Sequence, residues 1–73
     1  MTIAGRGRVS NQVRRLREAA AMTQAELGER VGATRQTIIA IEAEKYAPSL
    51  ELAFRLARAF GQTVDEVFRF HES

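Results

Sequence analysis

The sequence lacks cysteine and is poor in proline, histidine and aromatic residues. Its 73 residues include no cysteine, one proline, one histidine, four phenylalanines and one tyrosine. Disulfide bonds, thiolate metal sites and cysteine nucleophiles are therefore excluded. The single histidine, His71, cannot by itself form a histidine-rich metal site or a conventional catalytic triad. We therefore expect no metal and no cofactor, and the sequence predicts a protein that is not an enzyme.

Long apolar runs are also absent. No stretch approaches the roughly 18 residues that would span a membrane, and the first six residues, MTIAGR, lack the apolar segment of a signal peptide. We expect a cytoplasmic protein with no membrane partner. Hydrophobic residues make up 45% of the chain. This is enough for one core and little more, so stability calls for a partner subunit or near-ideal helix packing.

The net charge of +2 is divided unevenly along the chain. Residues 1–17 contain five arginines and no acidic residue, which gives +5, whereas residues 18–73 contain six basic and nine acidic residues, which gives −3. A basic end on a nearly neutral body is typical of a segment that meets a polyanion. A solvated, disordered terminus would have the same composition. The expected organisation is a flexible basic arm at residues 1–9, one domain at residues 10–70 and a tail at residues 71–73.

Helix-start signals at short intervals predict five helices. The expected helices span residues 11–21, 24–31, 35–43, 50–60 and 64–68. Each follows a hydroxyl side chain that can accept from a free backbone N–H at the helix start: Ser10, Thr23, Thr34, Ser49 and Thr63. Thr23 and Thr63 are each followed three residues later by glutamate, which makes two capping boxes. With short links between the helices, the predicted fold class is all-α.

The second and third predicted helices have the layout of a helix-turn-helix. They are joined by residues 31–34, a tight turn that contains Gly32. In this layout the second helix of the pair lies in the major groove of DNA. The small residues Ala25 and Ala33 are expected to let the two helices approach closely. In the helix at residues 35–43, the inward residues are Thr37, Ile38 and Ile41, and the outward residues are Arg35, Gln36, Ile39 and Ala40.

The run from Met22 to Glu42 resembles the Cro/repressor-type helix-turn-helix family, the XRE family. The pieces TQAEL, VG-T and RQTI--IE occur in the order and spacing of that family. Similarity continues through residues 45–53 and 64–68, so the resemblance covers about residues 10–70. It implies a compact five-helix, lambda-repressor-like fold and a short regulator whose partner is double-stranded DNA. One departure is that Ala43 and Glu44 stand where the family commonly has a turn with glycine, and Glu44 would repel phosphate.

The resemblance also implies roles for individual residues. Gln24 would bind a backbone phosphate, while Arg35 and Gln36 would meet base edges, as arginine suits guanine and glutamine suits adenine. Thr37 would reach a phosphate or pack on the core side. Ile39 would touch a thymine methyl group, or pack beside Val31 or a partner chain. The alternative for the polar residues is a solvated surface. The full predicted DNA-binding set is Arg14, Gln24, Thr34, Arg35, Gln36, Thr37, Ile39, Ala40, Lys45 and Tyr46.

Two further predictions concern a salt bridge and a dimer. Arg17 and Glu42 match a family pair that links the first helix to the end of the third, so we predict an ion pair with a structural role.

The helix at residues 50–60 is too apolar for the core to hide entirely. The predicted dimer interface consists of Leu50, Phe54, Val67, Phe68 and Phe70. Residues 68–71 alternate and could extend as a strand that pairs with its twin, whereas the alternative is that the aromatic residues complete the monomer core.

Together these patterns predict a sequence-specific transcriptional regulator, a repressor, that acts as a homodimer on a two-fold symmetric operator. The alternative function is the antitoxin of a toxin–antitoxin pair, in which a toxin protein would be a further partner. A third class, a fold used only for protein contacts, is disfavoured because Gln24, Arg35 and Gln36 are present. An enzyme is least favoured, because Asp65 and Glu66 are explained as acids at a helix start.

Overall fold

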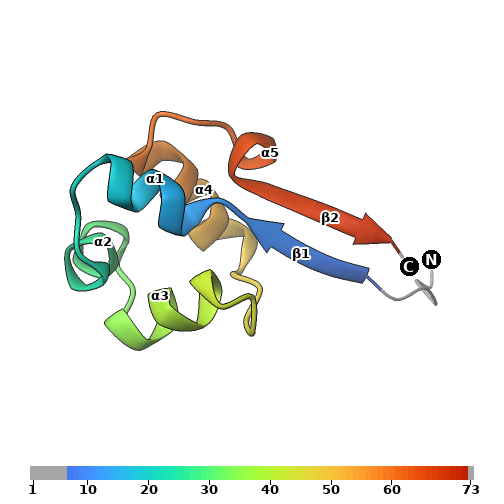
Figure 1. Cartoon of the computed structure of the whole chain (residues 1–73), viewed down its shortest axis with the longest axis horizontal. Helices are drawn as coiled ribbons and strands as arrows, with labels where there is room; N and C mark the ends of the chain where they lie inside the picture. Colours follow the sequence, from blue (N-terminus) through green and yellow to red (C-terminus); the bar gives the residue numbers. More distant parts are fainter. Residues whose placement is uncertain (1–6, 73) are drawn as a thin grey trace.

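The computed structural model describes residues 7–72, which form five helices and a two-stranded antiparallel sheet (Figure 1). The elements follow in the order β1 (Gly7–Asn11), α1 (Val13–Ala19), α2 (Gln24–Val31), α3 (Arg35–Glu42), α4 (Leu50–Ala59), α5 (Val64–Val67) and β2 (Phe68–Glu72). The helices form one body, and the sheet extends from it along the longest axis of the molecule. None of the helices in this part of the chain is long and apolar enough to cross a membrane.

The sheet corrects the prediction of a purely all-α fold. β1 and β2 pair in an antiparallel register that runs from Gly7 opposite Glu72 to Asn11 opposite Phe68. Residues 7–9, expected in a flexible arm, and residues 71–72, expected in a tail, are therefore strand residues, while residues 1–6 lie outside the described part. The strand predicted at residues 68–71 is present, but it pairs with β1 of its own chain. Val9 opposite Phe70 supplies an apolar cross-strand pair that favours this pairing.

The start of α1 also differs from the prediction. Ser10 lies in β1 and does not cap the helix. The Val13 N–H instead donates to the side-chain oxygen Oδ1 of Asn11 at 3.0 Å, and Asn11 Nδ2 donates to the Ile41 carbonyl at 2.8 Å. Because Asn11 joins the end of β1 to the end of α3, it fixes where the strand stops and the helix begins.

The other four helix starts are confirmed. In each, the predicted hydroxyl accepts the backbone N–H three residues ahead, at 3.0 Å for Thr23, 3.1 Å for Thr34 and 3.2 Å for Ser49 and Thr63. Both predicted capping boxes are complete, since Glu26 and Glu66 accept from the N–H groups of their cap residues. These local bonds place the ends of α2 and α3 that matter for the site.

α3 ends in a common pattern of C-terminal hydrogen bonds, but a glutamate, Glu44, takes the position where glycine is usual. The Glu44 N–H donates to the Ile41 carbonyl at 2.9 Å, and the Lys45 N–H donates to the Ala40 carbonyl at 3.0 Å. This is the Schellman pattern, which places its central residue in the left-handed region where glycine is favoured. Glu44 has φ of +60°, so a residue other than glycine takes the left-handed position of this turn.

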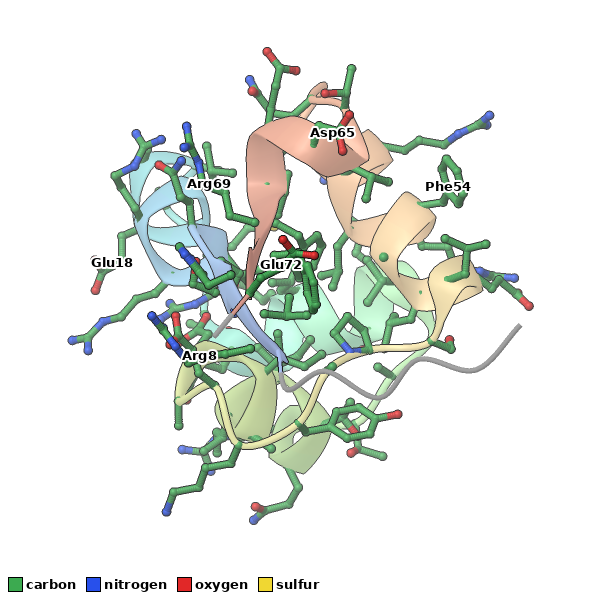
Figure 2. The ribbon with its side chains drawn as sticks, turned by 90° about the vertical axis from the view of Figure 1, so that its right-hand side faces the viewer. Arg8, Glu18, Phe54, Asp65, Arg69 and Glu72 are labelled. Atoms are coloured by element: carbon green, nitrogen blue, oxygen red, sulfur yellow. The ribbon has the colours of Figure 1, made fainter. Side chains whose placement is uncertain are left out.

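One apolar core holds the helices together. Its fully buried large side chains are Val13, Leu27, Ile38, Ile41, Leu56 and Val67. Val67 and Phe68 are only 1% and 9% exposed, which corrects their predicted place at a dimer interface. They complete the monomer core because α5 turns directly into β2 and directs both side chains inward. Figure 2 shows Phe54 pointing away from α4, in line with its 51% exposure.

Candidate nucleic-acid interface

The turn between α2 and α3 is tight because Gly28 has no side chain. A Cβ atom at Gly28 would lie 2.8 Å from the Ala33 carbonyl oxygen, and the Ala33 N–H donates to the Gly28 carbonyl at 2.8 Å. The sequence led us to assign this close approach to Ala25 and Ala33, but Ala25 is exposed. The missed signal was a glycine inside a helix, which costs about 1 kcal/mol there and usually has a packing reason.

The core fixes which face of α3 is presented to solvent. Ile38 and Ile41 are fully buried, as predicted, whereas Arg35 and Gln36 are exposed on the outward face. Ile39 is only half-buried, so it has surface left for a ligand. Ala40 is also half-buried. Two polar side chains at the start of the helix are therefore free to contact a partner, with an apolar patch behind them.

Two threonine hydroxyls lie side by side at the start of α3. Thr34 Oγ1 accepts the Thr37 N–H at 3.1 Å, and the two hydroxyl oxygens lie 2.9 Å apart. Only one of the two hydroxyl hydrogens is needed for the bond between them, so the other is free to donate. Thr34 is a helix cap in this structure, and Thr37 is half-buried beside it.

An open groove of about 650 Å³ lies between α1, the start of α2 and α3. Four predicted DNA-binding residues line it, namely Arg14, Gln24, Arg35 and Ile39, together with the predicted ion pair Arg17 and Glu42. Residues from three separate helices thus meet at one surface. The groove is continuous with the outward face of α3 through Arg35 and Ile39.

The predicted ion pair between Arg17 and Glu42 is present and largely buried. Arg17 Nε donates to Glu42 Oε2 at 2.6 Å and Nη2 donates to Oε1 at 3.2 Å, while the two side chains are 11% and 5% exposed. Arg17 Nη1 also donates to the Met22 carbonyl at 2.8 Å. The hydrogen bond to Glu42 raises the pKa of the Arg17 guanidinium further, so the arginine stays charged. The arginine cancels a carboxylate that would otherwise repel an anion in the groove.

Gln24 joins this network, a contact that the sequence did not predict. Its Nε2 donates to Glu42 Oε1 at 3.1 Å, which fixes the amide at the edge of the groove. The amide nitrogen carries two hydrogens, so one remains free to donate. Gln24 is also the first residue of α2, where unpaired backbone N–H groups favour an anion. The Arg17–Glu42 pair therefore holds both the end of α3 and a donor at the start of α2.

The residues after α3 are exposed, as is Arg14. Lys45 and Tyr46 have no ion pair or side-chain hydrogen bond among residues 7–72, and Tyr46 is 47% exposed. Arg14 is held loosely by Glu18 at 3.4 Å on the exposed side of α1. The Glu44 carboxylate turns toward β1, where it accepts the Asn11 N–H at 3.3 Å and lies 3.6 Å from the Arg8 guanidinium. Its predicted repulsion of phosphate is thus partly offset.

An exposed polar helix, docked through a tight glycine turn beside a groove of arginine and amide side chains, defines a helix-turn-helix protein. A family profile described as Helix-turn-helix matches residues 13–67. The chain belongs to this family, which confirms its resemblance to the Cro/repressor (XRE) type.

Relatives of nearly the same length match most of this chain in sequence. An uncharacterized HTH-type transcriptional regulator of Methanothermobacter thermautotrophicus is 51% identical over 61 residues, covering 82% of this chain and 88% of that protein. The HTH-type transcriptional regulator YgzD of Bacillus subtilis is 44% identical over 64 residues, covering 88% and 97%. A crystal structure from Bacteroides fragilis, only 20% identical, superposes with a TM-score of 0.74 over 84% of this chain and 98% of that one, which supports the fold alone.

Proposed function

We propose that this protein is a cytoplasmic transcriptional regulator, and specifically a repressor, that recognises a double-stranded DNA sequence through α3. The observation that carries this proposal is the outward face of α3, where Arg35 and Gln36 are exposed beside a groove lined by Arg14 and Gln24. Two relatives that are described as HTH-type transcriptional regulators support the proposal. Repression would follow from occupancy of promoter DNA.

In this proposal, side chains in the first turn of α3 contact the base edges and read the sequence. Arg35 has the paired donors that match guanine O6 and N7, and Gln36 has the donor and acceptor that match adenine N6 and N7. Each well-formed pair contributes about 1–3 kcal/mol of discrimination against a wrong base. Ile39 and Ala40 follow on the same face, where a thymine methyl group would meet their apolar surface.

Backbone contacts surround this reading helix. Gln24 would donate its second amide hydrogen to a phosphate, with the free N–H groups of α2 beside it. The free hydroxyl hydrogen of the Thr34–Thr37 pair would reach another phosphate. Lys45, Tyr46 and Arg14 are exposed at the edges of the same surface. Such contacts set the position of the helix and carry no sequence information themselves.

We also propose that the protein acts as a homodimer on a two-fold symmetric operator. A single half-site with two or three base contacts binds weakly and unselectively in a genome. Three large apolar side chains of the predicted interface are exposed in the described part of the chain, Leu50 at 70%, Phe54 at 51% and Phe70 at 63%. They are what is left of the predicted interface after Val67 and Phe68 are assigned to the core. The half-sites would lie about 34–36 Å apart.

The test is selection of bound sequences from random duplexes, followed by titration of the winner. A two-fold symmetric motif with half-sites one turn apart is the expected result. Arg35→Ala should relax the preference at one base position by about 1–3 kcal/mol. Gln24→Ala is the matched control, because loss of a phosphate contact weakens binding to all sequences equally. Uniform weakening by Arg35→Ala would contradict base reading by this residue.

The oligomeric state is measured separately by light scattering on the full chain. A dimer that Phe54→Glu converts to a monomer supports the homodimer. The opposite result is a wild-type monomer that selects only a single half-site. It would favour the alternative function, an antitoxin whose exposed apolar residues bind a toxin protein.

A further inference from the structure

The sheet of β1 and β2 has a polar face with no part in the proposed base reading. In the antiparallel register Arg8 lies opposite His71, and Ser10 lies opposite Arg69. Directly opposed residues share a face of a sheet. These four side chains therefore lie on one face, whereas Val9, Phe68 and Phe70 lie on the other. The Ser10 hydroxyl and His71 Nε2 are 2.7 Å apart, which holds both side chains over the polar face.

This polar face is basic and contains no acidic residue of the sheet. Arg69 is exposed and has no ion-pair partner among residues 7–72. Arg8 is 63% exposed, and its only ion pair in that part of the chain is to Glu44 at 3.6 Å. Figure 2 shows Arg8 and Arg69 on the same side of the strands, the side of α1, with Glu72 across from them. The sheet thus carries two guanidinium groups that are exposed and weakly neutralised.

The basic face is attached to the DNA-reading surface. Asn11, the last residue of β1, donates to the Ile41 carbonyl in the last turn of α3 and to Glu44 just beyond it. α1, which contributes Arg14 to the groove, begins two residues after β1. The end of β1 nearest the helices is therefore fixed to the end of α3. The strands then extend outward from the body in the direction away from α2 (Figure 1).

We propose that the basic face of the sheet, Arg8 and Arg69, is a second contact to the DNA backbone, beyond the segment read by α3. This inference rests on the proposed function only in that the ligand is duplex DNA, and it needs no base-specific contact. A guanidinium fork matches phosphate oxygens in a bidentate geometry and binds any sequence. Arg8 exchanges its long contact with Glu44 for a phosphate when DNA is present, and Arg69 binds without losing a partner.

The experiment measures the salt dependence of binding by the full chain to one 30-base-pair duplex of random sequence and one of selected sequence. Each phosphate contact adds about 0.9 to the slope of log affinity against log salt. Arg69→Gln and Arg8→Gln should each lower the slope by about that amount. The loss of affinity between 50 and 200 mM salt should then shrink by about three- to four-fold per arginine, on both duplexes alike.

Two further variants sharpen the test. Arg58→Gln removes the same charge from an exposed position on α4, so it reports the general effect of net charge. Glu44→Gln retains an acceptor for the Asn11 N–H but removes the carboxylate beside Arg8, so it should strengthen binding to both duplexes. Thermal unfolding followed by circular dichroism should be nearly unchanged in all four surface variants.

The outcomes separate this proposal from the proposed function. A selected motif together with slopes in Arg8→Gln and Arg69→Gln equal to that of Arg58→Gln would overturn the backbone contact alone. Lower slopes on random DNA without any selected motif would support the backbone contact and overturn base reading. Absence of binding to either duplex would overturn both.

Discussion

The helix-turn-helix and the terminal sheet are held in place by interactions of different range. The helix-turn-helix is defined by bonds that span three to five residues, such as the Thr34 cap of α3 and the Ala33–Gly28 bond that closes α2. In the sheet, the Ser10–His71 contact joins residues 61 positions apart. The first region is therefore encoded by local residue choices, whereas the second requires that the helices bring the ends of the chain together.

The two regions also differ in how much of them reaches the core. α2 and α3 bury Leu27, Ile38 and Ile41 completely. The sheet places only Phe68 in the core, with Val9 packed partly against it. An isolated pair of strands is marginally stable in water. The sheet should therefore depend on its anchoring residues, and it should be possible to weaken either region without the other.

The largest expected effect is in the buried ion pair. Glu42→Ala leaves the Arg17 guanidinium without its partner in a site that is 11% exposed, which should cost about 3–5 kcal/mol. The double variant Arg17→Met with Glu42→Leu removes both charges and should be close to wild type in stability. Urea unfolding measures both. The double variant should still bind DNA more weakly, because Gln24 has lost its partner.

If Glu42→Ala and the double variant were equally destabilised, the pair would act through packing and not through its charges. Equal DNA affinity of the double variant and wild type would contradict the role of the pair in positioning Gln24.

The two phenylalanines of β2 should respond very differently to truncation. Phe68 is 9% exposed, so Phe68→Ala should cost about 3 kcal/mol through loss of buried surface. Phe70 is 63% exposed and covers Gly7, so Phe70→Ala should cost less than about 1 kcal/mol in the monomer. Amide hydrogen exchange should show lost protection in β1 and β2 for Phe68→Ala before any loss in α2 and α3. Simultaneous loss in all elements would mean that the sheet and the helices unfold as one unit.

Gly28→Ala tests whether α2 must pack as closely as it does against the turn that leads into α3. The added methyl group would meet the Ala33 carbonyl oxygen at 2.8 Å, and the backbone must move to relieve this contact. We expect a loss of about 1–3 kcal/mol, although alanine favours helix at most positions. Gly32→Ala is the control, because it strains the backbone at φ of +76° with no contact closer than 3.5 Å. A gain of stability in Gly28→Ala would refute the packing role.

The last prediction is a small gain of stability. Ala21 follows α1 with φ of +56° and is exposed, so Ala21→Gly should relieve strain and lose no contact. The expected stabilisation is about 1 kcal/mol, which raises Tm by roughly 4–8 °C in a domain of this size. Differential scanning calorimetry measures it. An unchanged or lower Tm would show that the flexibility of glycine in the unfolded chain offsets the relief.

The parts of the fold that could be predicted are those with local causes. Thr23, Thr34 and Thr63 mark helix starts because a hydroxyl binds an N–H three residues away, so no distant partner is needed. Gly32 marks a turn for an equally local reason. The resemblance added the Arg17–Glu42 pair, which periodicity alone would not reveal. Expected site residues such as Gln24 and Arg35 meet in one groove because these local signals place the starts of α2 and α3 correctly.

The parts that escaped prediction depend on contacts across the chain. Residues 7–11 include Val9 at helical spacing from Val13, so the same residues fit a helix start as well as a strand. Only their pairing with residues 68–72 decides between the two. The burial of Val67 and Phe68, and the Gln24–Glu42 bond, likewise depend on where distant elements meet. Glu44 was expected to repel DNA, and its turn toward Arg8 follows from the position of β1.

The pairing of Gly7 with Glu72 has a mechanical consequence. Both ends of the described chain leave the same tip of the sheet, so a force that pulls them apart acts on that pair first. The strands would separate one residue pair at a time, toward Asn11 and Phe68, while the helices bear no load. Peeling of this kind needs far less force than sliding strands past one another. A force applied between the two ends would therefore open the sheet and leave α3 in place until the last pair opened.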